Sequence, residues 1–340
     1  MSEFGPEQPI KSASKDWRPL STKNIVVDEK SGVGKKSIRI MSINLMRDMW
    51  HKCTWKERVP KIIRLIELKN PDIIGFQECI DIPNHPLTEF LDELKKIGYR
   101  VDVHFDFSPN NKIKLAVVNA WKKEKHIKKI FYRTLWLSPT PWSSVPATSW
   151  GQKIARPIGV NAFRIRGFMH PLCIVNTHFG HSSFEKERSA ELLPGLIQSL
   201  LNVPHSTIFL GDFNETTQKL ENGEKVKDVD VKKIICESNP AFQMREFTGT
   251  AITDIGSISP GGNFFSTEDD SHPTPLNEIG DQLDLFFGHN VDIAGPVQIC
   301  DQTFETPIPP FCSKRGVYVS DHMPICADFV ECFSINLQTV

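Results

Sequence analysis

The sequence has almost no excess of charge of either sign. Its 340 residues include 40 Lys and Arg against 41 Asp and Glu, which leaves a formal net charge of −1. Proteins that bind duplex DNA or anionic membranes through their overall charge need a marked positive excess. That class is therefore disfavoured, and only a local basic segment, the densest of which is residues 121–130, could attract a polyanion.

The sequence also lacks a long apolar run. No stretch approaches the roughly 18 apolar residues of a membrane span, and residues 1–17 contain no apolar segment of the kind found in secretion signals. None of the eight cysteines forms a CxxC motif, and several lie inside apolar runs such as residues 171–179. This pattern is typical of buried thiols in a reducing compartment. We expect a cytoplasmic protein; export without a leader is the alternative, because it would leave no mark in the sequence.

The composition is that of a globular protein, with 39% hydrophobic and 24% charged residues. Residues 1–36 are polar throughout and rich in Gly, Pro, Ser and Lys, which predicts an irregular N-terminal arm. Inspection shows no internal repeat. We therefore expect residues 37–340 to form a single domain.

Apolar periodicity predicts the elements of this domain. Helical spacing predicts helices at residues 54–68, 87–97, 184–202 and 228–237. Thr54 and Glu57 have the spacing of a capping box at the start of the first helix. Short apolar or alternating runs predict strands at residues 35–46, 72–78, 114–121, 130–137, 160–167, 171–179, 207–211, 282–288 and 322–330. Residues 216–227 and 256–280 are polar and predict loops, so the whole succession predicts a layered α/β or α+β sandwich.

Polar residues of a restricted kind sit in or directly after these strands. They are Asn44, Glu78, His178, Asp212, Asn214, Asp284, Asp321 and His322. Asp212 and Asn214 fall two residues apart, so an extended chain sends both side chains to the same side. Each residue alone could be an ordinary cap or turn residue. Together they indicate a site, because charges beside apolar runs cost several kcal/mol unless they are paired or bind a metal.

The chemistry of these side chains favours a hard cation. Carboxylate and amide oxygens without thiolates suit Mg²⁺ or Mn²⁺. Zinc is the rival, because His178 and His181 are closely spaced. That pair lies at the junction of a strand and a loop, and no cysteine stands at ligand spacing, so the zinc hypothesis is the weaker one.

Six motifs in order resemble the endonuclease/exonuclease/phosphatase superfamily. They are SINL, DIIGFQE, NTHF, LGDFN, QLDLFF and SDHMPI, which together span residues 42–325. The superfamily includes deoxyribonuclease-like nucleases, abasic endonucleases, neutral sphingomyelinases, inositol-polyphosphate 5-phosphatases and poly(A) deadenylases. The resemblance implies a four-layered sandwich, in which two mixed β-sheets pack face to face with helices outside and the site lies at one edge of the sheets.

The resemblance also implies a metal side of the site. Glu78 would be the principal Mg²⁺ ligand, with Asn44 beside it, and Asp321 would complete this side. A divalent cation fits the reaction, since hydrolysis of a phosphate ester adds water to a centre that is already anionic.

The remaining motif residues are implied to act on water and phosphate. Asp212 and Asn214 would orient or deprotonate the attacking water and contact the phosphate. His322, held in its tautomer by Asp284, would bind phosphate oxygens. His178 would stabilise charge on the phosphoryl or leaving group.

Some positions depart from the family patterns. The abasic-endonuclease branch has an acidic residue where this chain has Met46, so membership of that branch is not implied. Residues 134–160 are more similar to a bacterial-type subgroup with a Trp-rich loop, whose members often read Thr-His-x-Asp-His; here Gly180 replaces the Asp. Arg156 and His181 are candidates for contacts to the substrate phosphate.

We expect a metal-dependent phosphoric ester hydrolase that resembles phosphodiesterases and nucleases. A phosphomonoesterase acting on a sugar phosphate or a phosphoinositide is the alternative within the enzyme class. A catalytically idle binding module is the alternative outside it, although the presence of the predicted catalytic residues speaks against that. The substrate would be a phosphate ester, namely a nucleic acid, a sugar phosphate or a phosphoinositide.

Overall fold

A computed structural model describes most of the predicted domain. The described residues are 37–45, 55–81, 86–105, 115–124, 126–148, 150, 154–201, 203–215, 218–221, 224–247, 283–300 and 324–332. The predicted arm at 1–36, the Thr54 cap and the candidate site residues Asp321 and His322 lie outside them.

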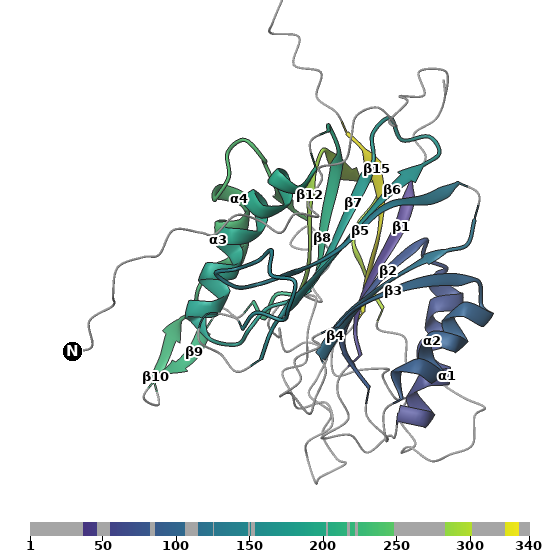
Figure 1. Cartoon of the computed structure of the whole chain (residues 1–340), viewed down its shortest axis with the longest axis horizontal. Helices are drawn as coiled ribbons and strands as arrows, with labels where there is room; N and C mark the ends of the chain where they lie inside the picture. The colour runs from purple at the N-terminus through teal and green to yellow at the C-terminus, as the bar shows by residue number, and fades with distance from the viewer. Residues whose placement is uncertain are drawn as a thin grey trace, which may run out of the picture.

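Two mixed β-sheets form the centre of the molecule (Figure 1). The first sheet has seven strands. Six of them follow the order β13-β15-β1-β2-β4-β3, and the seventh, β14, pairs with β15. Their bounds are β1 (Ile38–Asn44), β2 (Ile73–Ile80), β3 (Tyr99–Phe105), β4 (Leu115–Lys122), β13 (Val291–Ile293), β14 (Gln298–Ile299) and β15 (Ile325–Glu331). The second has six strands in the order β11-β12-β8-β7-β6-β5, and these are β5 (Ile127–Trp136), β6 (Pro157–Ile165), β7 (Leu172–His178), β8 (Ser206–Asp212), β11 (Arg245–Glu246) and β12 (Asp284–His289).

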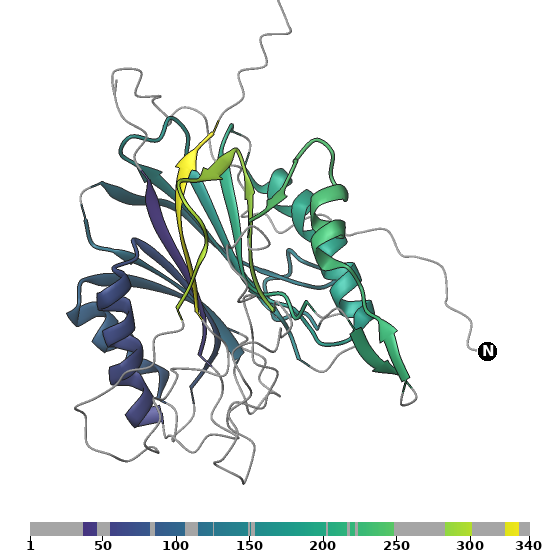
Figure 2. The same ribbon diagram turned by 180° about the vertical axis from the view of Figure 1, so that it is seen from behind.

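The helices cover the outer faces of the two sheets, as Figures 1 and 2 show from opposite sides. The helices α1 (Trp55–Lys69) and α2 (Leu87–Lys96) pack on the first sheet through one apolar cluster. The helices α3 (Ser183–Leu200) and α4 (Val231–Glu237) pack on the second sheet through another. A third cluster fills the space between the sheets. The predicted four-layered sandwich of two mixed sheets and flanking helices is thereby confirmed.

The local sequence explains why these elements form. In α2 the buried residues Leu87, Phe90, Leu91 and Leu94 recur at helical spacing and face the sheet. The Ser182 side chain caps α3 by accepting a hydrogen bond from the backbone N–H of Glu185 at 3.2 Å. Such signals are local, so the predicted helices lie within a few residues of the observed ones.

One predicted loop is a hairpin instead. Residues 216–227 contain the paired strands β9 (Gln218–Glu221) and β10 (Glu224–Lys227). Their polar composition conceals them, because a hairpin away from the core needs no apolar face. Asn-Gly dipeptides are common in two-residue hairpin turns, so the sequence Asn222-Gly223 was the available signal.

Two parallel strand pairs determine where the functional residues lie. β1 pairs with β2 in the first sheet and β7 pairs with β8 in the second, both in parallel. α1 connects the first pair and α3 the second, so each sheet contains one β-α-β unit. Parallel strands end at the same edge of their sheet, and each unit therefore brings the carboxyl ends of two strands together.

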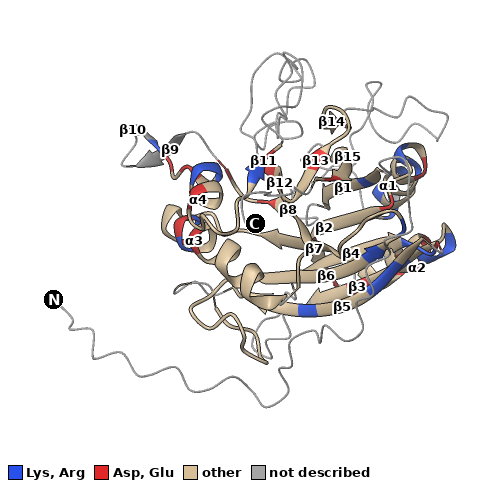
Figure 3. Ribbon diagram, turned by 90° about the horizontal axis from the view of Figure 1, so that it is seen from above, with Lys and Arg blue, Asp and Glu red and all other residues tan. Residues whose placement is uncertain are grey.

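No helix in the described part of the chain is long and apolar enough to cross a membrane. Among the same residues no disulfide joins the six cysteines, four of which are buried. Lys and Arg occur beside Asp and Glu on both helix layers (Figure 3), in agreement with the net charge of −1.

Candidate active site

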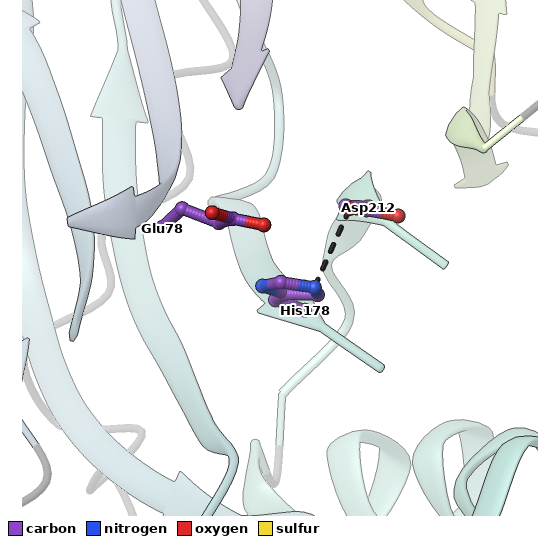
Figure 4. Close-up of side chains that lie close together, drawn as sticks. All are labelled: Glu78, His178 and Asp212. Carbon is purple, nitrogen blue, oxygen red and sulfur yellow. Dashed lines mark ion pairs between the residues drawn. The ribbon is translucent and has the colours of Figure 1, made fainter. Parts of the chain in front are cut away.

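Side chains from both β-α-β units meet at one edge of the sandwich (Figure 4). Glu78 comes from β2, His178 ends β7 and Asp212 ends β8. One ligand atom from each lies within 4.8 Å of the others. His178 and Asp212 are buried, whereas Glu78 is partly exposed, so the cluster has a solvent-facing side.

The backbone at Glu78 is irregular in a way that directs its side chain. The pairing of β2 with β4 shifts register between Phe76 and Cys79, and Glu78 has a φ of 53°. A bulge of this kind turns a strand residue out of the regular alternation. A non-glycine residue at positive φ is uncommon, and such conformations concentrate at functional sites.

Asn44, at the end of β1, lies between the two carboxylates. Its Nδ2 donates a hydrogen bond to Asp212 Oδ2 at 2.9 Å and lies 3.5 Å from Glu78 Oε1. The Nε2 of His178 is 3.4 Å from the same Asp212 oxygen. Two ionised carboxylates this close repel each other, and a cation between them would remove that repulsion.

Asp212 and Asn214 are joined by a tight turn. The backbone N–H of Asn214 donates to Asp212 Oδ1 at 2.9 Å, and its Nδ2 donates to the Phe179 carbonyl at 2.9 Å. Asn214 has a φ of 50°, which Asn tolerates better than most residues. Gly211 is required just before the turn, because at its φ of +142° a Cβ would lie 2.0 Å from the Thr177 carbonyl oxygen.

The other predicted site residues occupy three further positions. Asp284 begins β12 directly opposite Asp212 and is buried. Arg156 is buried just before β6, whose residue Ile158 pairs with Thr177 next to His178. His181 is exposed, with its ring centroid 6.3 Å from that of His178. Asp321 and His322 lie outside the described residues.

Three buried charged residues beside this site were not predicted from the sequence. Glu185 and Lys186 are adjacent in α3, and Glu215 follows Asn214. Burial raises the pKa of Glu215 to about 7, although its side chain accepts a hydrogen bond from the Val231 N–H at 3.0 Å. The only signal for Glu215 was its position after GDFN, and the two helical residues resembled an ordinary polar face.

The donor set fits a divalent cation. Glu78 and Asp212 offer carboxylate oxygens and His178 offers a ring nitrogen. Asn44 turns its Nδ2 toward both carboxylates, so it would offer its amide oxygen to an ion only after its side-chain amide rotates. Oxygen-rich sets of this kind suit Mg²⁺ or Mn²⁺. In the described residues His181 does not join the cluster, so the His178–His181 pair that suggested zinc is not a ready-made pair of ligands.

Comparisons with known proteins bear on the family and the fold of this chain. A model of the endonuclease/exonuclease/phosphatase family matches residues 41–322. An uncharacterized protein of Acanthamoeba polyphaga mimivirus is 30% identical over 191 residues, which are 54% of this chain and 69% of the viral one.

Solved structures share the fold at low sequence identity. An endonuclease/exonuclease/phosphatase family protein of Bacteroides thetaiotaomicron is 17% identical with a TM-score of 0.63, over 91% of this chain and 99% of that one. A mannosyl-6-phosphatase of the same bacterium is 18% identical with a TM-score of 0.63, over 86% of this chain and all of that one.

Proposed function

Because this chain belongs to the endonuclease/exonuclease/phosphatase family, we propose that it hydrolyses a phosphate ester by metal-assisted attack of water. The observation that carries the proposal is the meeting of Glu78, His178 and Asp212, which two sheets contribute to one edge of the sandwich. Paired carboxylates beside an imidazole and an amide are the groups that this reaction needs.

Glu78 and Asn44 are the proposed holders of Mg²⁺ or Mn²⁺, with Asp321 as a further ligand. Glu78 is the partly exposed member of the cluster, which gives an ion access from solvent. When bound, the ion would supply charge neutralisation for the phosphoryl oxygens.

Asp212 is the proposed group that orients or deprotonates the attacking water. Both of its oxygens are already directed: Oδ2 faces Asn44 and His178, and Oδ1 accepts from the backbone of Asn214. A carboxylate held this way loses little freedom when it binds water, and such preorganisation lowers the barrier to reaction. Asn214 would help to place the phosphate.

The remaining residues would act on charge and substrate. His178 would stabilise charge that develops on the phosphoryl or leaving group, and Asp284 would orient His322 on the phosphate oxygens. Arg156 and His181 are proposed substrate contacts, since both lie near the end of β7.

A phosphodiester is the substrate class that we propose first. A phosphomonoester, such as a sugar phosphate or a phosphoinositide, is the second candidate, and the fold shared with a mannosyl-6-phosphatase is the reason to include sugar phosphates in any test. Against an idle binding module stand the close contacts among Asn44, Asp212 and Glu78, which a purely structural edge would not need.

The test is a substrate panel with the purified full chain. Single-stranded and duplex DNA and RNA, sugar phosphates, inositol phosphates and sphingomyelin are each incubated with Mg²⁺, Mn²⁺, Zn²⁺ or EDTA. Activity should disappear in EDTA and return with Mg²⁺ or Mn²⁺. Asp212→Asn should lower turnover by about two to four orders of magnitude. Asp92→Asn, at an exposed ion pair of α2, is the matched control and should leave it unchanged.

Three results would contradict the proposal. Undiminished hydrolysis in EDTA would contradict the proposed need for a metal ion. Restoration of activity by Zn²⁺ alone would contradict the assignment of Mg²⁺ or Mn²⁺. Wild-type turnover in Asp212→Asn would show that the reaction takes place elsewhere.

A further inference from the structure

A buried lysine of α3 reaches the turn that holds the site. Lys186 is only 1% exposed, and its Nζ donates a hydrogen bond to the carbonyl oxygen of Asn214 at 3.0 Å. The same Nζ pairs with Asp228, a buried residue shortly before α4. A buried ammonium is tolerated only when it is paired and hydrogen-bonded. Lys186 therefore joins three segments: α3, the turn after β8 and the approach to α4.

Asp228 is itself held in place from two further directions. Its Oδ1 accepts from the Ser183 hydroxyl at 2.7 Å and from the backbone N–H of Val229 at 2.8 Å. Lys186 thus has a fixed anchor on one side and the Asn214 carbonyl on the other. The ion pair adds no net charge near the site. It therefore affects the turn by holding the Asn214 carbonyl in place through the Lys186 hydrogen bond.

The adjacent residue of α3 contacts the other turn of the site. Glu185 is buried, and a Cβ placed on Gly180 would lie 2.2 Å from its Oε2. The Glu185 carboxylate therefore occupies the space where most residues at position 180 would have a side chain. Two consecutive charged residues of α3 are thus packed beneath the turns that follow β7 and β8.

We propose that Lys186 is a positioning residue for the reaction. Its ammonium holds the left-handed backbone of Asn214, and through the N–H of Asn214 it holds the Oδ1 atom of Asp212. Lys186 does not touch the reacting atoms and acts only through this turn. The inference rests on the proposed function, in which Asp212 orients the water. A displacement of about 1 Å in such a group can lower turnover by about a hundredfold.

The experiment removes the ion pair without leaving one charge buried. The variant is Lys186→Met combined with Asp228→Asn. Its matched control is Arg188→Met with Glu191→Gln, which neutralises an exposed pair of the same helix, 2.8 Å apart. Turnover with the panel's best substrate should fall by about ten- to a hundredfold in the first double variant, with KM and the half-saturating Mg²⁺ concentration within about threefold of wild type. The control should match wild type.

A second measurement does not depend on activity. Hydrogen–deuterium exchange should rise in a peptide covering residues 209–215 of the Lys186 double variant, and stay unchanged in β7. If the wild type hydrolyses no substrate, the proposed function fails, and this exchange alone decides whether Lys186 holds the turn. Unchanged exchange there would overturn the inference.

The activity measurements also test the inference about Lys186. A folded double variant with wild-type turnover, or an equal loss in the Arg188 control, would overturn the inference. If the double variant does not fold, Ser183→Ala is the milder test, because it removes only the hydrogen bond from the Ser183 hydroxyl to Asp228 and keeps the ion pair. It should lower turnover by about two- to fivefold at constant KM, and wild-type turnover in that variant would overturn the inference too.

Discussion

His104 should make the stability of the fold sensitive to acid. It lies on β3 between the sheets and is fully buried, with Nδ1 3.0 Å from Thr134 Oγ1 and Nε2 3.3 Å from Asn161 Oδ1. Asn161 donates through its Nδ2 to Asp102 at 2.6 Å, so its Oδ1 is an acceptor and Nε2 of His104 must carry the proton. The neutral ring therefore satisfies both neighbours.

Burial lowers the pKa of His104 to about 4. The hydrogen bond to Asn161 and the nearby Asp102 carboxylate oppose this shift, while Lys129 adds to it, and the ring of Tyr132 stacks on the imidazole at 4.8 Å. In the unfolded chain His104 returns to its ordinary value of about 6.5. Between these two values the unfolded state binds more protons, so stability is complete above pH 6.5 and is lost as the pH falls toward 4.

The size of the effect follows from the two pKa values. Linkage predicts that this group alone removes about 2 kcal/mol from the free energy of unfolding between pH 7.5 and pH 5, and about 3 kcal/mol by pH 4. Domains of ordinary stability have only about 5–15 kcal/mol in total. A single buried histidine should therefore produce a shift that is easy to measure.

The measurement is urea unfolding at pH 7.5 and pH 5, followed by circular dichroism, for wild type and His104→Gln. Glutamine can donate and accept hydrogen bonds but takes up no proton in this range. His205 and His289, whose pKa values burial also lowers, are present in both proteins and cancel in the comparison. Wild type should lose about 2 kcal/mol more than the variant between the two pH values. Equal losses in the two proteins would refute the assignment to His104.

Two predictions concern the site itself. Glu78→Gln should raise the Mg²⁺ concentration needed for half-maximal rate by about tenfold or more, since even outer-shell partners of a metal act on that scale. The exposed control Glu93→Gln should not, and an unchanged titration would remove Glu78 from the metal ligands. His322→Ala should cut turnover by roughly two to four orders of magnitude and Asp284→Asn somewhat less. The double variant should be little worse than His322→Ala, because the two residues would act as one unit; fully additive losses in folded protein would contradict the dyad.

Much of the fold follows from local patterns. The apolar spacing of α2 and α3 and the Ser182 cap lie within single segments, so the sequence predicts these helices within a few residues. Strand β3 was overlooked although its apolar and polar residues alternate, and the hairpin of β9 and β10 escaped because it is polar. Periodicity detects an element only where burial on one face imposes an apolar pattern.

The sequence by itself also determined which residue types end the central strands. A polar residue at the end of an apolar run can be recognised from the sequence alone. This is how we selected Asn44, Glu78, His178 and Asp212. Their meeting could not be derived that way. Glu78 belongs to one sheet and Asp212 to the other, so their proximity depends on how the two sheets pack, and on the bulge that turns Glu78 out of its strand.

Only the tertiary structure decided what supports the site. Lys186 is one of several charged residues in α3, and helical spacing gives no reason to separate it from the exposed Arg188. Its burial arises because Asp228, distant in the sequence, and the carbonyl of Asn214 meet at the same point of the fold. A charge can be buried only where partners from other segments surround it. Contacts between distant segments leave no periodic trace in the chain, so the support of the site was decided by packing alone.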